Sequence, residues 1–337
     1  MKIQRLGLIG LLLLVSACQP TTEMDGDEQV VVYTSRQPHL IEPVFQRYTE
    51  ETGVRVVFTS DNEAALIERL AAEGERTPAD LLITVDAGNL WQAAERGLLA
   101  AIDSPFLEQV VPKALRDDQG QWFGLSVRAR TLVYHPDRVD ASSLSTYEDL
   151  ADPRWRGRLC LRSSRKVYNQ SLIAMLIEHH GEAEAERIVA GWVANLATNP
   201  YSSDTQAIEA VAAGQCDVAV VNSYYLGRLV AADPDYPVRL FWVNQAAQGV
   251  HVNISGAGVT RHARRPAQAQ ALLEWLASNN AQADFAFSNF EFPIDEQVPL
   301  EGVVAEWGTF RADDTPLSVT GQRQSQAVRL ADRVGYR

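Results

Sequence analysis

Short runs rich in β-branched residues alternate with longer stretches of helical period in the first third of this 337-residue chain, and this alternation constrains the fold most. The run 29–33 is followed by a stretch, 39–52, whose apolar residues recur at the spacing of an amphipathic helix that Gly53 would end. Such alternation is typical of an α/β fold whose strands are joined through helices. Further strands are predicted at 54–59 and 79–84, and further helices at 64–72 and 87–96.

Two later segments, 125–134 and 252–259, are long and extended, and each lies between regions that look like complete α/β units. We expect them to be crossover strands between two lobes, since about 310 residues beyond the amino-terminal segment suffice for two globular lobes. Between them we expect strands at 157–161 and 217–221 and helices at 171–180, 184–196 and 205–213; after them, helices at 266–279 and 282–289 precede a less regular tail from Pro293.

The first eighteen residues have the pattern of a secretory signal. Lys2 and Arg5 precede an apolar core that is too short for a finished transmembrane helix. The end of this segment, Leu14-Val15-Ser16-Ala17-Cys18, resembles a bacterial lipobox, in which cleavage leaves the cysteine as a lipid-modified amino terminus. We therefore expect a lipoprotein signal peptide at 1–18, lipidation of Cys18 and a flexible tether at 19–28. An ordinary signal peptide cut near Ala17 is the alternative.

The charge balance excludes one class of partner. Removal of the first eighteen residues takes away two basic residues and no acidic one, which leaves 28 basic against 43 acidic residues, or −15. Such a chain should repel nucleic acid. The Lys and Arg residues are scattered without a basic amphipathic helix, so the acyl chain is the expected membrane attachment of a soluble, monomeric body.

Two adjacent tyrosines follow the apolar run 216–221, in the sequence Asn222-Ser223-Tyr224-Tyr225. A strand ending in paired phenols can direct both at one crevice, and a phenolate is a hard oxygen ligand suited to hard cations. Tyr168 is a third candidate. Paired tyrosines are also common packing residues whose hydroxyls find a partner, and from the pair alone we would favour packing. Tyr168 could equally be a surface aromatic residue.

Four short motifs follow one another along the chain: Tyr33-Thr34-Ser35-Arg36, Thr77-Pro78-Ala79-Asp80, Trp155-Arg156-Gly157-Arg158 and Asn222-Ser223-Tyr224-Tyr225. In this order and spacing they resemble bacterial periplasmic ferric-iron-binding proteins, in which the tandem tyrosine is the specific part. The resemblance covers nearly the whole mature chain. It implies a two-lobed α/β periplasmic-binding-protein fold of type II, with two hinge strands and the ligand in the interlobe cleft.

The same resemblance implies a domain division and a set of partners. Lobe 1 is expected at 29–125 with 255–300, and lobe 2 at 126–254 with 301–337. Proteins of this family are similar in architecture to transferrin lobes and feed an ABC importer, so the expected partners are a permease and its ATPase. The expected location is the periplasm, with the protein anchored to the membrane as a lipoprotein.

Carried over residue by residue, the resemblance makes Tyr224 and Tyr225 the paired iron ligands and Tyr168 the additional tyrosine of the cyanobacterial-type subfamily. This chain departs from the family on the first lobe. Gln37 and Pro38 stand where relatives have a histidine and a tyrosine, and Val85 stands where other relatives have a glutamate. The first lobe has therefore lost its usual ligands or replaced them with His39 or Asp86, which are weak candidates; His39 is expected to be solvated.

Three phenolates would cancel the charge of Fe³⁺ and leave coordination positions for water, carbonate or citrate. An added anion would make the site negative, and a guanidinium has a planar fork suited to an oxyanion. Arg128 on the first crossover strand corresponds to a cleft arginine in relatives and is the first candidate, with Arg228 and Arg36 after it. Arg128 could instead pair with an acidic residue on the surface. Whether Fe³⁺ or Fe²⁺ is the working ligand is left open.

Two other features have simpler interpretations. His179 and His180 close a predicted helix before Gly181, where imidazole is favoured near the negative end of the helix dipole, so we interpret them as a cap. Cys160 ends one predicted strand and Cys216 opens another, and in an oxidising compartment they could form a disulfide. Buried free thiols are the alternative.

Motifs of enzymes are missing from the sequence, which has no zinc-spaced His/Cys cluster, nucleophile elbow, P-loop or dinucleotide glycine fingerprint. The leading hypothesis is a substrate-binding lipoprotein that captures ferric iron and delivers it to a permease. The alternative keeps the fold but binds a small organic ligand such as thiamine, a polyamine or a phosphonate. A cleft enzyme or a sensor partner domain is the rival from another class.

Overall fold

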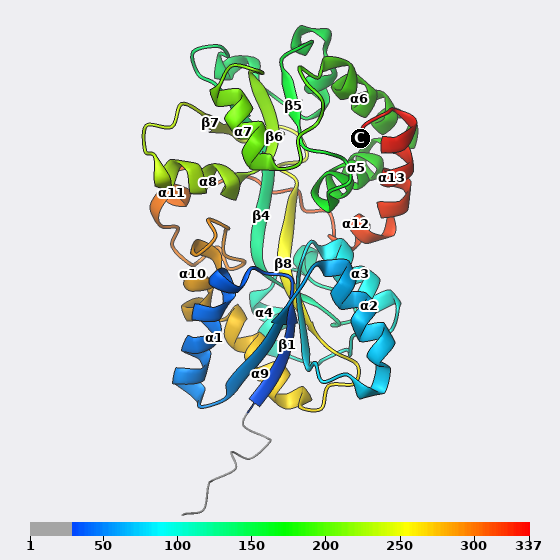
Figure 1. Ribbon diagram of the computed structural model, residues 1–337, viewed down its shortest axis with the longest axis vertical. Coiled ribbons are helices and arrows are strands. Elements are labelled where there is room, and N and C mark those ends of the chain that lie inside the picture. Colours follow the sequence, from blue (N-terminus) through cyan, green and yellow to red (C-terminus); the bar gives the residue numbers. More distant parts are fainter. Residues whose placement is uncertain (1–28) are drawn as a thin grey trace, which may run out of the picture.

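The computed structural model describes residues 29–337. The expected signal peptide, the tether and Cys18 lie outside the described residues. The described chain forms two α/β lobes stacked along the long axis of the molecule, as the sequence predicts (Figure 1). The first lobe, below in this view, contains β1 to β3, α1 to α4, α9 and α10; the second lobe contains β5 to β7, α5 to α8, α11 and α13, and α12 packs against both α3 and α5 between the lobes.

One sheet runs through both lobes. In residues 29–337 its strand order is β2-β1-β3-β8-β4-β6-β5, and β7 pairs with β4. The long strands β4 and β8 pair with each other in antiparallel fashion and cross from one lobe to the other, which confirms the two predicted crossovers. The strands are β1 (Gln29–Thr34), β2 (Arg55–Ser60), β3 (Leu81–Val85), β4 (Phe123–Tyr134), β5 (Leu159–Leu161), β6 (Val218–Asn222), β7 (Arg239–Phe241) and β8 (Val252–Val259).

The first lobe follows the local signals of its sequence. Pro38 occupies the first turn of α1, where its missing N–H costs no helical hydrogen bond, and Gly53 ends the helix with a φ of 77° that a side chain would disfavour. The apolar face of α1 is buried against the sheet and α10. The helices are α1 (Pro38–Thr52), α2 (Glu63–Glu73), α3 (Ala87–Glu95), α4 (Pro105–Val110), α9 (Pro266–Ala277) and α10 (Asn279–Phe287).

The second lobe packs its helices around β5, β6 and the upper part of β4. Helix α5 is apolar almost all round, and most of its residues from Tyr168 to Ile177 are buried. Its neighbours α6 and α13 cover it on the outside. The helices are α5 (Val167–His180), α6 (Glu182–Asn195), α7 (Asp204–Ala212), α8 (Ser223–Ala232), α11 (Gly302–Glu306) and α13 (Gln324–Arg333), and α12 (Ser318–Gln322) lies between α5 and α3 of the first lobe.

Three sequence-based expectations about helices are wrong in detail. The tail beyond Pro293 contains α11, α12 and α13; α13 is so polar that only Ala327, Leu330 and Ala331 are buried along it. Helix α5 begins at Val167 and not at Ser171, so Tyr168 lies in its first turn. Finally, Tyr224 and Tyr225 do not end a strand but lie in the first turn of α8, directly after β6.

The two histidines at the end of α5 bind acidic side chains. The Nε2 atom of His179 lies 2.6 Å from Oδ2 of Asp313, and Nε2 of His180 lies 2.7 Å from Oε1 of Glu148. Among residues 29–337 there is no group of three or more His, Cys, Asp or Glu side chains that could hold a metal ion. The histidines therefore connect α5 to its surroundings, including the tail.

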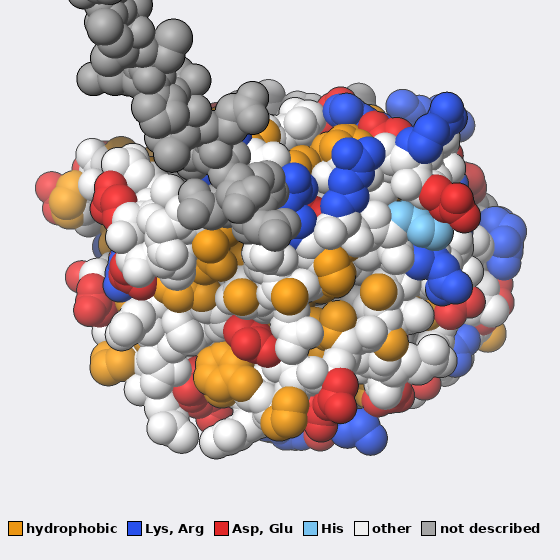
Figure 2. Space-filling model, turned by 90° about the horizontal axis from the view of Figure 1, so that it is seen from below, with side chains coloured by type: hydrophobic (Ala, Val, Ile, Leu, Met, Phe, Trp, Pro, Cys, Tyr) orange, Lys and Arg blue, Asp and Glu red, His pale blue; other side chains and the backbone are white. Residues whose placement is uncertain are grey.

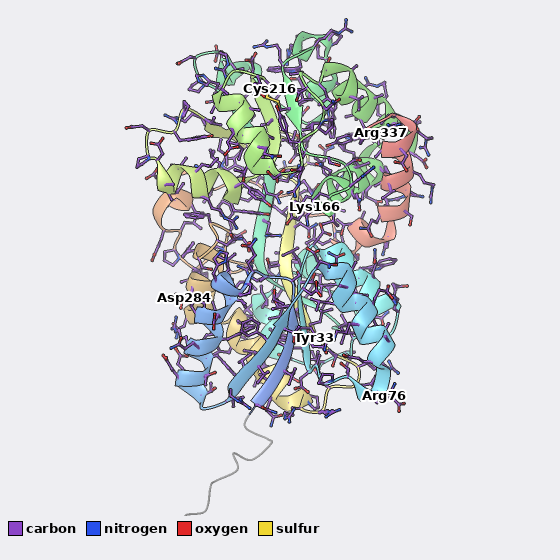
Figure 3. The ribbon with its side chains drawn as sticks, viewed as in Figure 1. Tyr33, Arg76, Lys166, Cys216, Asp284 and Arg337 are labelled. Atoms are coloured by element: carbon purple, nitrogen blue, oxygen red, sulfur yellow. A yellow bond between two sulfur atoms is a disulfide. The ribbon has the colours of Figure 1, made fainter. Side chains whose placement is uncertain are left out.

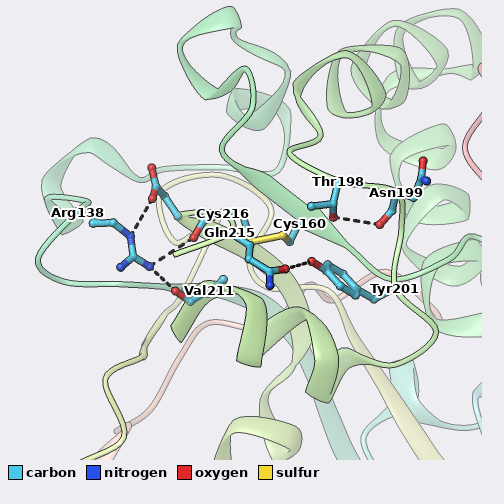
Figure 4. Close-up of a disulfide and its surroundings, with 9 residues drawn as sticks. Arg138, Cys160, Thr198, Asn199, Tyr201, Val211, Gln215 and Cys216 are labelled. Atoms are coloured by element: carbon cyan, nitrogen blue, oxygen red, sulfur yellow. Dashed lines mark hydrogen bonds and ion pairs between the residues drawn. A yellow bond between two sulfur atoms is a disulfide. The ribbon is translucent and has the colours of Figure 1, made fainter. Parts of the chain in front are cut away.

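Cys160 and Cys216 form a disulfide between β5 and the residues that lead into β6 (Figure 4). Both side chains are buried in a small apolar cluster with residues of α7 and β6. Beside them, the hydroxyl of Tyr201 donates to Gln215, and Arg138 donates to the carbonyl oxygens of Val211 and Cys216. The bridge closes a loop over a sequence separation of 56 residues.

Replacing both cysteines with alanine is expected to lower the free energy of unfolding by about 2–4 kcal/mol, because a loop of this length is constrained in the unfolded chain by the bridge. Urea denaturation of the wild type and the variant, each with and without reductant, measures the difference. Reductant should have no effect on the Cys160→Ala, Cys216→Ala variant. Equal urea midpoints for the wild type and the variant, both without reductant, would contradict a stabilising role of the disulfide.

The outer surface is mixed in character. Seen from below, the end of the first lobe carries apolar, acidic and basic side chains interspersed (Figure 2). Across residues 29–337 the most exposed large apolar side chains are Val57, Phe106 and Val328, each less than two-fifths exposed. No helix in the same residues is long and apolar enough to span a bilayer.

Candidate metal centre

The three candidate tyrosines are brought together by neighbouring parallel strands. β5 and β6 pair in parallel, with Leu161 opposite Val220, so their carboxyl ends meet at one edge of the sheet. The chain that leaves β5 reaches Tyr168 in the first turn of α5, and the chain that leaves β6 passes directly into α8 with Tyr224 and Tyr225. Segments more than fifty residues apart therefore present their phenols on the same side of the second lobe.

A buried arginine fixes these two helix starts relative to each other. Arg130 of β4 donates to Oδ1 of Asn169, at 2.6 Å, and to Oδ1 of Asn222, at 3.0 Å. Its charge is balanced by the buried carboxylate of Asp204, 3.2 Å away, which also accepts from the backbone N–H of Asn222. Because Asn169 follows Tyr168 and Asn222 precedes Ser223-Tyr224, this network sets the distance between the tyrosine-bearing turns.

The three tyrosines line one cavity of about 270 Å³ between the lobes. Its first-lobe wall and its second-lobe wall differ strongly in chemistry, since the tyrosines and most of the cations belong to the second. The lining residues are Ser35, Arg36, Gln37, Leu40, Glu63 and Val85 from the first lobe, Arg128 on the crossover strand, Arg162, Lys166, Tyr168, Tyr224, Tyr225 and Arg228 from the second lobe, and Asn289 beyond α10.

Within this cavity the phenols lie close together. The rings of Tyr224 and Tyr225 have centroids 4.4 Å apart, and the guanidinium of Arg128 lies 5.5 Å from the ring centroid of Tyr168 and 4.6 Å from that of Tyr224. Tyr224 also accepts from the side-chain amide of Asn222 at 3.2 Å. Tyr224 is 1% exposed, Tyr168 is 8% exposed and Tyr225 is more open. The three phenols, each with one oxygen atom that could bind a metal ion, therefore line the same cavity.

Four cations surround the phenols. Arg128 donates to the Tyr168 hydroxyl at 3.4 Å and lies 4.6 Å from the centroid of the Tyr224 ring. Arg162 donates to the Tyr225 hydroxyl at 3.3 Å. Lys166 lies 4.9 Å from the Tyr168 ring, and Arg228 lies over both Tyr224 and Tyr225 at 5.4 and 5.5 Å. At Tyr168, the positive charge of Arg128 and Lys166 favours phenolate over phenol.

The pKa values of the neighbouring phenols of Tyr168 and Tyr224 are shifted in opposite directions. Burial opposes ionisation of Tyr168, but the charges of Arg128 and Lys166 outweigh it and hold the pKa of this phenol below its ordinary value. Burial raises the pKa of Tyr224 well above the ordinary value, and the nearby Tyr168 and Tyr225 add to the effect against the pull of Arg128. Tyr168 is therefore the easier of the two to ionise, and a cation would be needed to ionise both.

Arg128 and Arg36, both proposed from the sequence as anion-binding groups, are held by one buried carboxylate. Glu291 accepts from Arg36 at 3.1 Å and from Arg128 at 3.0 Å. Ser126 and Asn289 also donate to Glu291, while Arg36 lies over the ring of Phe285. Burial opposes ionisation of Glu291, but the two arginines lower its pKa to about 2. Arg128 is thus ion-paired with Glu291 and also contacts the tyrosines, whereas the charge of Arg36 is balanced by Glu291.

The two weak first-lobe candidates do not line the cavity. His39 is exposed at the start of α1. Asp86 is buried at the start of α3, where its carboxylate accepts from the backbone N–H of Gly88, from Ser171 at 2.7 Å and from Asn253 at 2.8 Å. Burial raises the pKa of Asp86 to about 6 in spite of these bonds. Asp86 therefore connects the first lobe to α5 and to the crossover strand β8, and Gln37 faces the cavity instead.

Sequence reasoning missed Arg162, Lys166 and Glu63. A signal existed for Arg162, because it directly follows the strand β5 and so lies at the same sheet edge as the tyrosines. Lys166 is the residue before α5, and Glu63 is the first residue of α2. Their Nζ and Oε1 atoms are 3.7 Å apart across the cleft, and Figure 3 places Lys166 between the lobes. Only the three-dimensional arrangement reveals that pair.

Comparisons with known proteins identify the family of this chain. The family described as bacterial extracellular solute-binding protein matches residues 76–312. "Iron uptake protein A2" of Synechocystis sp. is 41% identical, over 98% of this chain and 96% of the relative, and the "Fe(3+)-binding periplasmic protein" of Serratia marcescens is 27% identical over 87% of each chain. The structure of Trichodesmium FutA in complex with iron and citrate has a TM-score of 0.89 and 42% identity, covering 92% of this chain and all of that one.

These relatives are solute-binding transport proteins and not enzymes. Their similarity extends over both lobes, since it covers nine-tenths of the chain or more in the Synechocystis and Trichodesmium cases. The chain therefore belongs to the bacterial extracellular solute-binding proteins, in the group of periplasmic proteins that bind ferric iron.

Proposed function

We propose that this protein captures Fe³⁺ in the interlobe cleft through the phenolates of Tyr168, Tyr224 and Tyr225 and delivers it to an ABC importer. The observation that carries the proposal is the convergence of three phenols on one cavity that four cations surround. Phenolate oxygen is a hard donor, which suits Fe³⁺ better than Fe²⁺. The relatives named for iron uptake and Fe³⁺ binding support the same cargo.

Charge balance supports an additional ligand. Three phenolates neutralise Fe³⁺ but do not fill an octahedral sphere, so water, carbonate or citrate would occupy the remaining positions. Arg128, Arg162 and Arg228 line the cavity and would offset the charge of such an anion. The Trichodesmium relative, whose structure contains iron and citrate, supports citrate as one such partner.

The crossover strands supply the expected motion. β4 and β8 each belong to both lobes, so a small change in their course would open or close the cleft as a hinge. We keep the lobe boundaries, 29–125 with 255–300 and 126–254 with 301–337, as a proposal. Anchoring in the periplasm through lipidated Cys18, a monomeric state, and a permease and ATPase as partners belong to the same proposal.

Titration of metal-free protein with ferric citrate is expected to give a red or purple band and one iron per chain, because phenolate-to-iron charge transfer absorbs visible light. Absorption spectra and metal analysis of the desalted protein measure both. Citrate without iron is the control and should give no band. A colourless protein that retains less than one iron per chain would contradict the proposal and favour a small organic ligand.

The same titration at lower pH is expected to show weaker binding. Each phenolate ligand must take up a proton when the metal leaves, so protons compete with Fe³⁺ for the site. Binding should therefore strengthen as the pH rises and weaken as it falls. Equal apparent affinity for iron at pH 7.5 and pH 5.5, after correction for citrate protonation, would argue against phenolate ligands.

A further inference from the structure

The first-lobe wall of the cavity has one acidic side chain among its described residues. Leu40 and Val85 are apolar, Ser35 and Gln37 are neutral, and the charge of Arg36 is taken by Glu291. Glu63 is the exception, and its carboxylate is an oxygen donor of the kind that hard cations prefer. An anionic contact from the first lobe to a cation in this cavity would therefore have to come from Glu63.

Glu63 is held in place at the start of α2. The side chain of Asn62 caps this helix by accepting from the backbone N–H of Ala65 at 2.9 Å, which fixes the first turn. From there the Oε1 atom of Glu63 lies 3.7 Å from Nζ of Lys166, and the same Nζ lies 4.9 Å from the centroid of the Tyr168 ring. The carboxylate thus reaches across the cleft to the neighbourhood of the tyrosines.

We propose that Glu63 is the ligand that the first lobe contributes to the captured ferric iron, exchanging Lys166 for the metal as its partner. This inference rests on the proposed function. The ion pair is loose, since 3.7 Å exceeds the usual distance of a charge-assisted hydrogen bond. A trivalent cation near Tyr168 attracts the carboxylate more strongly than a single ammonium group does.

The exchange keeps the site close to charge balance. Fe³⁺ with three phenolates and one carboxylate carries one negative charge, which the freed Lys166 ammonium offsets, while Arg128 and Arg162 keep the carboxylates of Glu291 and Asp204 as partners. A ligand from the first lobe to a metal held by the second lobe also connects the two lobes directly. Iron binding therefore replaces a loose ion pair between the lobes with a metal–carboxylate bond between them.

Glu63→Gln tests the inference, with Glu68→Gln on the same helix as the matched control because Glu68 is exposed and pairs with Arg96 away from the cleft. Each protein is loaded with ferric nitrilotriacetate, dialysed and titrated with EDTA. We expect Glu63→Gln to keep a visible band. It should release iron at an EDTA concentration at least roughly tenfold lower than the wild type requires. Glu68→Gln should match the wild type. Small-angle scattering should show less compaction on iron binding for Glu63→Gln.

The variant Lys166→Met distinguishes two roles of Glu63, that of a metal ligand and that of a partner in an ion pair between the lobes. It removes the ion pair but leaves the carboxylate of Glu63 in place. A ligand predicts a loss of affinity for Glu63→Gln that is at least several times the loss for Lys166→Met. Equal losses would mean that the ion pair matters and would overturn the inference. Wild-type affinity of Glu63→Gln would overturn it as well. A wild type that binds no iron would instead refute the proposed function itself, which keeps the two failures distinct.

Discussion

The Tyr224→Phe, Tyr225→Phe double variant is expected to retain no iron under conditions that saturate the wild type. Two of the three phenolate donors disappear, and the single phenolate left at Tyr168, even together with the Glu63 carboxylate, cannot balance Fe³⁺ beside the cations Arg128 and Lys166. The rings remain, so the stacking of the pair at 4.4 Å and the contacts with Arg128 and Arg228 are preserved. Loss of colour and of bound metal should therefore occur without unfolding, as measured by absorption, metal analysis and circular dichroism.

Tyr201→Phe is the matched control for the loss of a hydroxyl. Tyr201 lies in the same lobe, its hydroxyl donates to Gln215 near the disulfide, and its side chain is not part of the cavity lining. This variant should bind one iron with the wild-type spectrum. If the double variant also bound one iron with an unchanged band, the phenols of Tyr224 and Tyr225 would not be ligands and the proposed site would be wrong.

Most of the secondary structure could be predicted from local patterns. Val30 and Val32 recur with the period of a strand, and α1 shows both its proline start and its glycine end in the sequence. The polar helix α13 could not be predicted in the same way. It has few apolar residues, and these become a core face only because α5 and α6 are there to receive them.

The residues of the candidate site also fall into two groups, those that local sequence predicts and those that only the whole fold brings together. The tyrosine pair could be identified because it directly follows an apolar strand, where side chains collect at a sheet edge. The surroundings could not, since Arg128 and Glu291 are 163 residues apart in the sequence and Lys166 and Glu63 belong to different lobes. Nothing local to Glu291 indicates a buried carboxylate between two arginines. Long-range pairing of this kind depends on the whole fold.

Glu291→Gln is expected to lower the free energy of unfolding by about 3–5 kcal/mol, because it removes one partner of a buried charge network and leaves Arg36 and Arg128 uncompensated. Glu291 is fully buried, and its oxygens accept from both guanidinium groups. Urea denaturation at neutral pH measures the change. Glu296→Gln, an exposed position in the same segment, is the matched control and should stay within about 0.5 kcal/mol of the wild type.

The pH dependence gives this prediction a second readout. The folded-state pKa of Glu291 is about 2, below the value of 4.5 for an unperturbed glutamate, so its contribution to stability is complete above about pH 4.5 and is lost as the pH falls towards 2. The difference in unfolding free energy between wild type and Glu291→Gln should therefore be constant near neutrality and shrink below pH 4.5, because protonation gives the wild type the neutral side chain that the variant already has. A difference that stayed constant down to pH 3, or that was absent at pH 7, would show that the carboxylate charge does not stabilise the junction between the lobes.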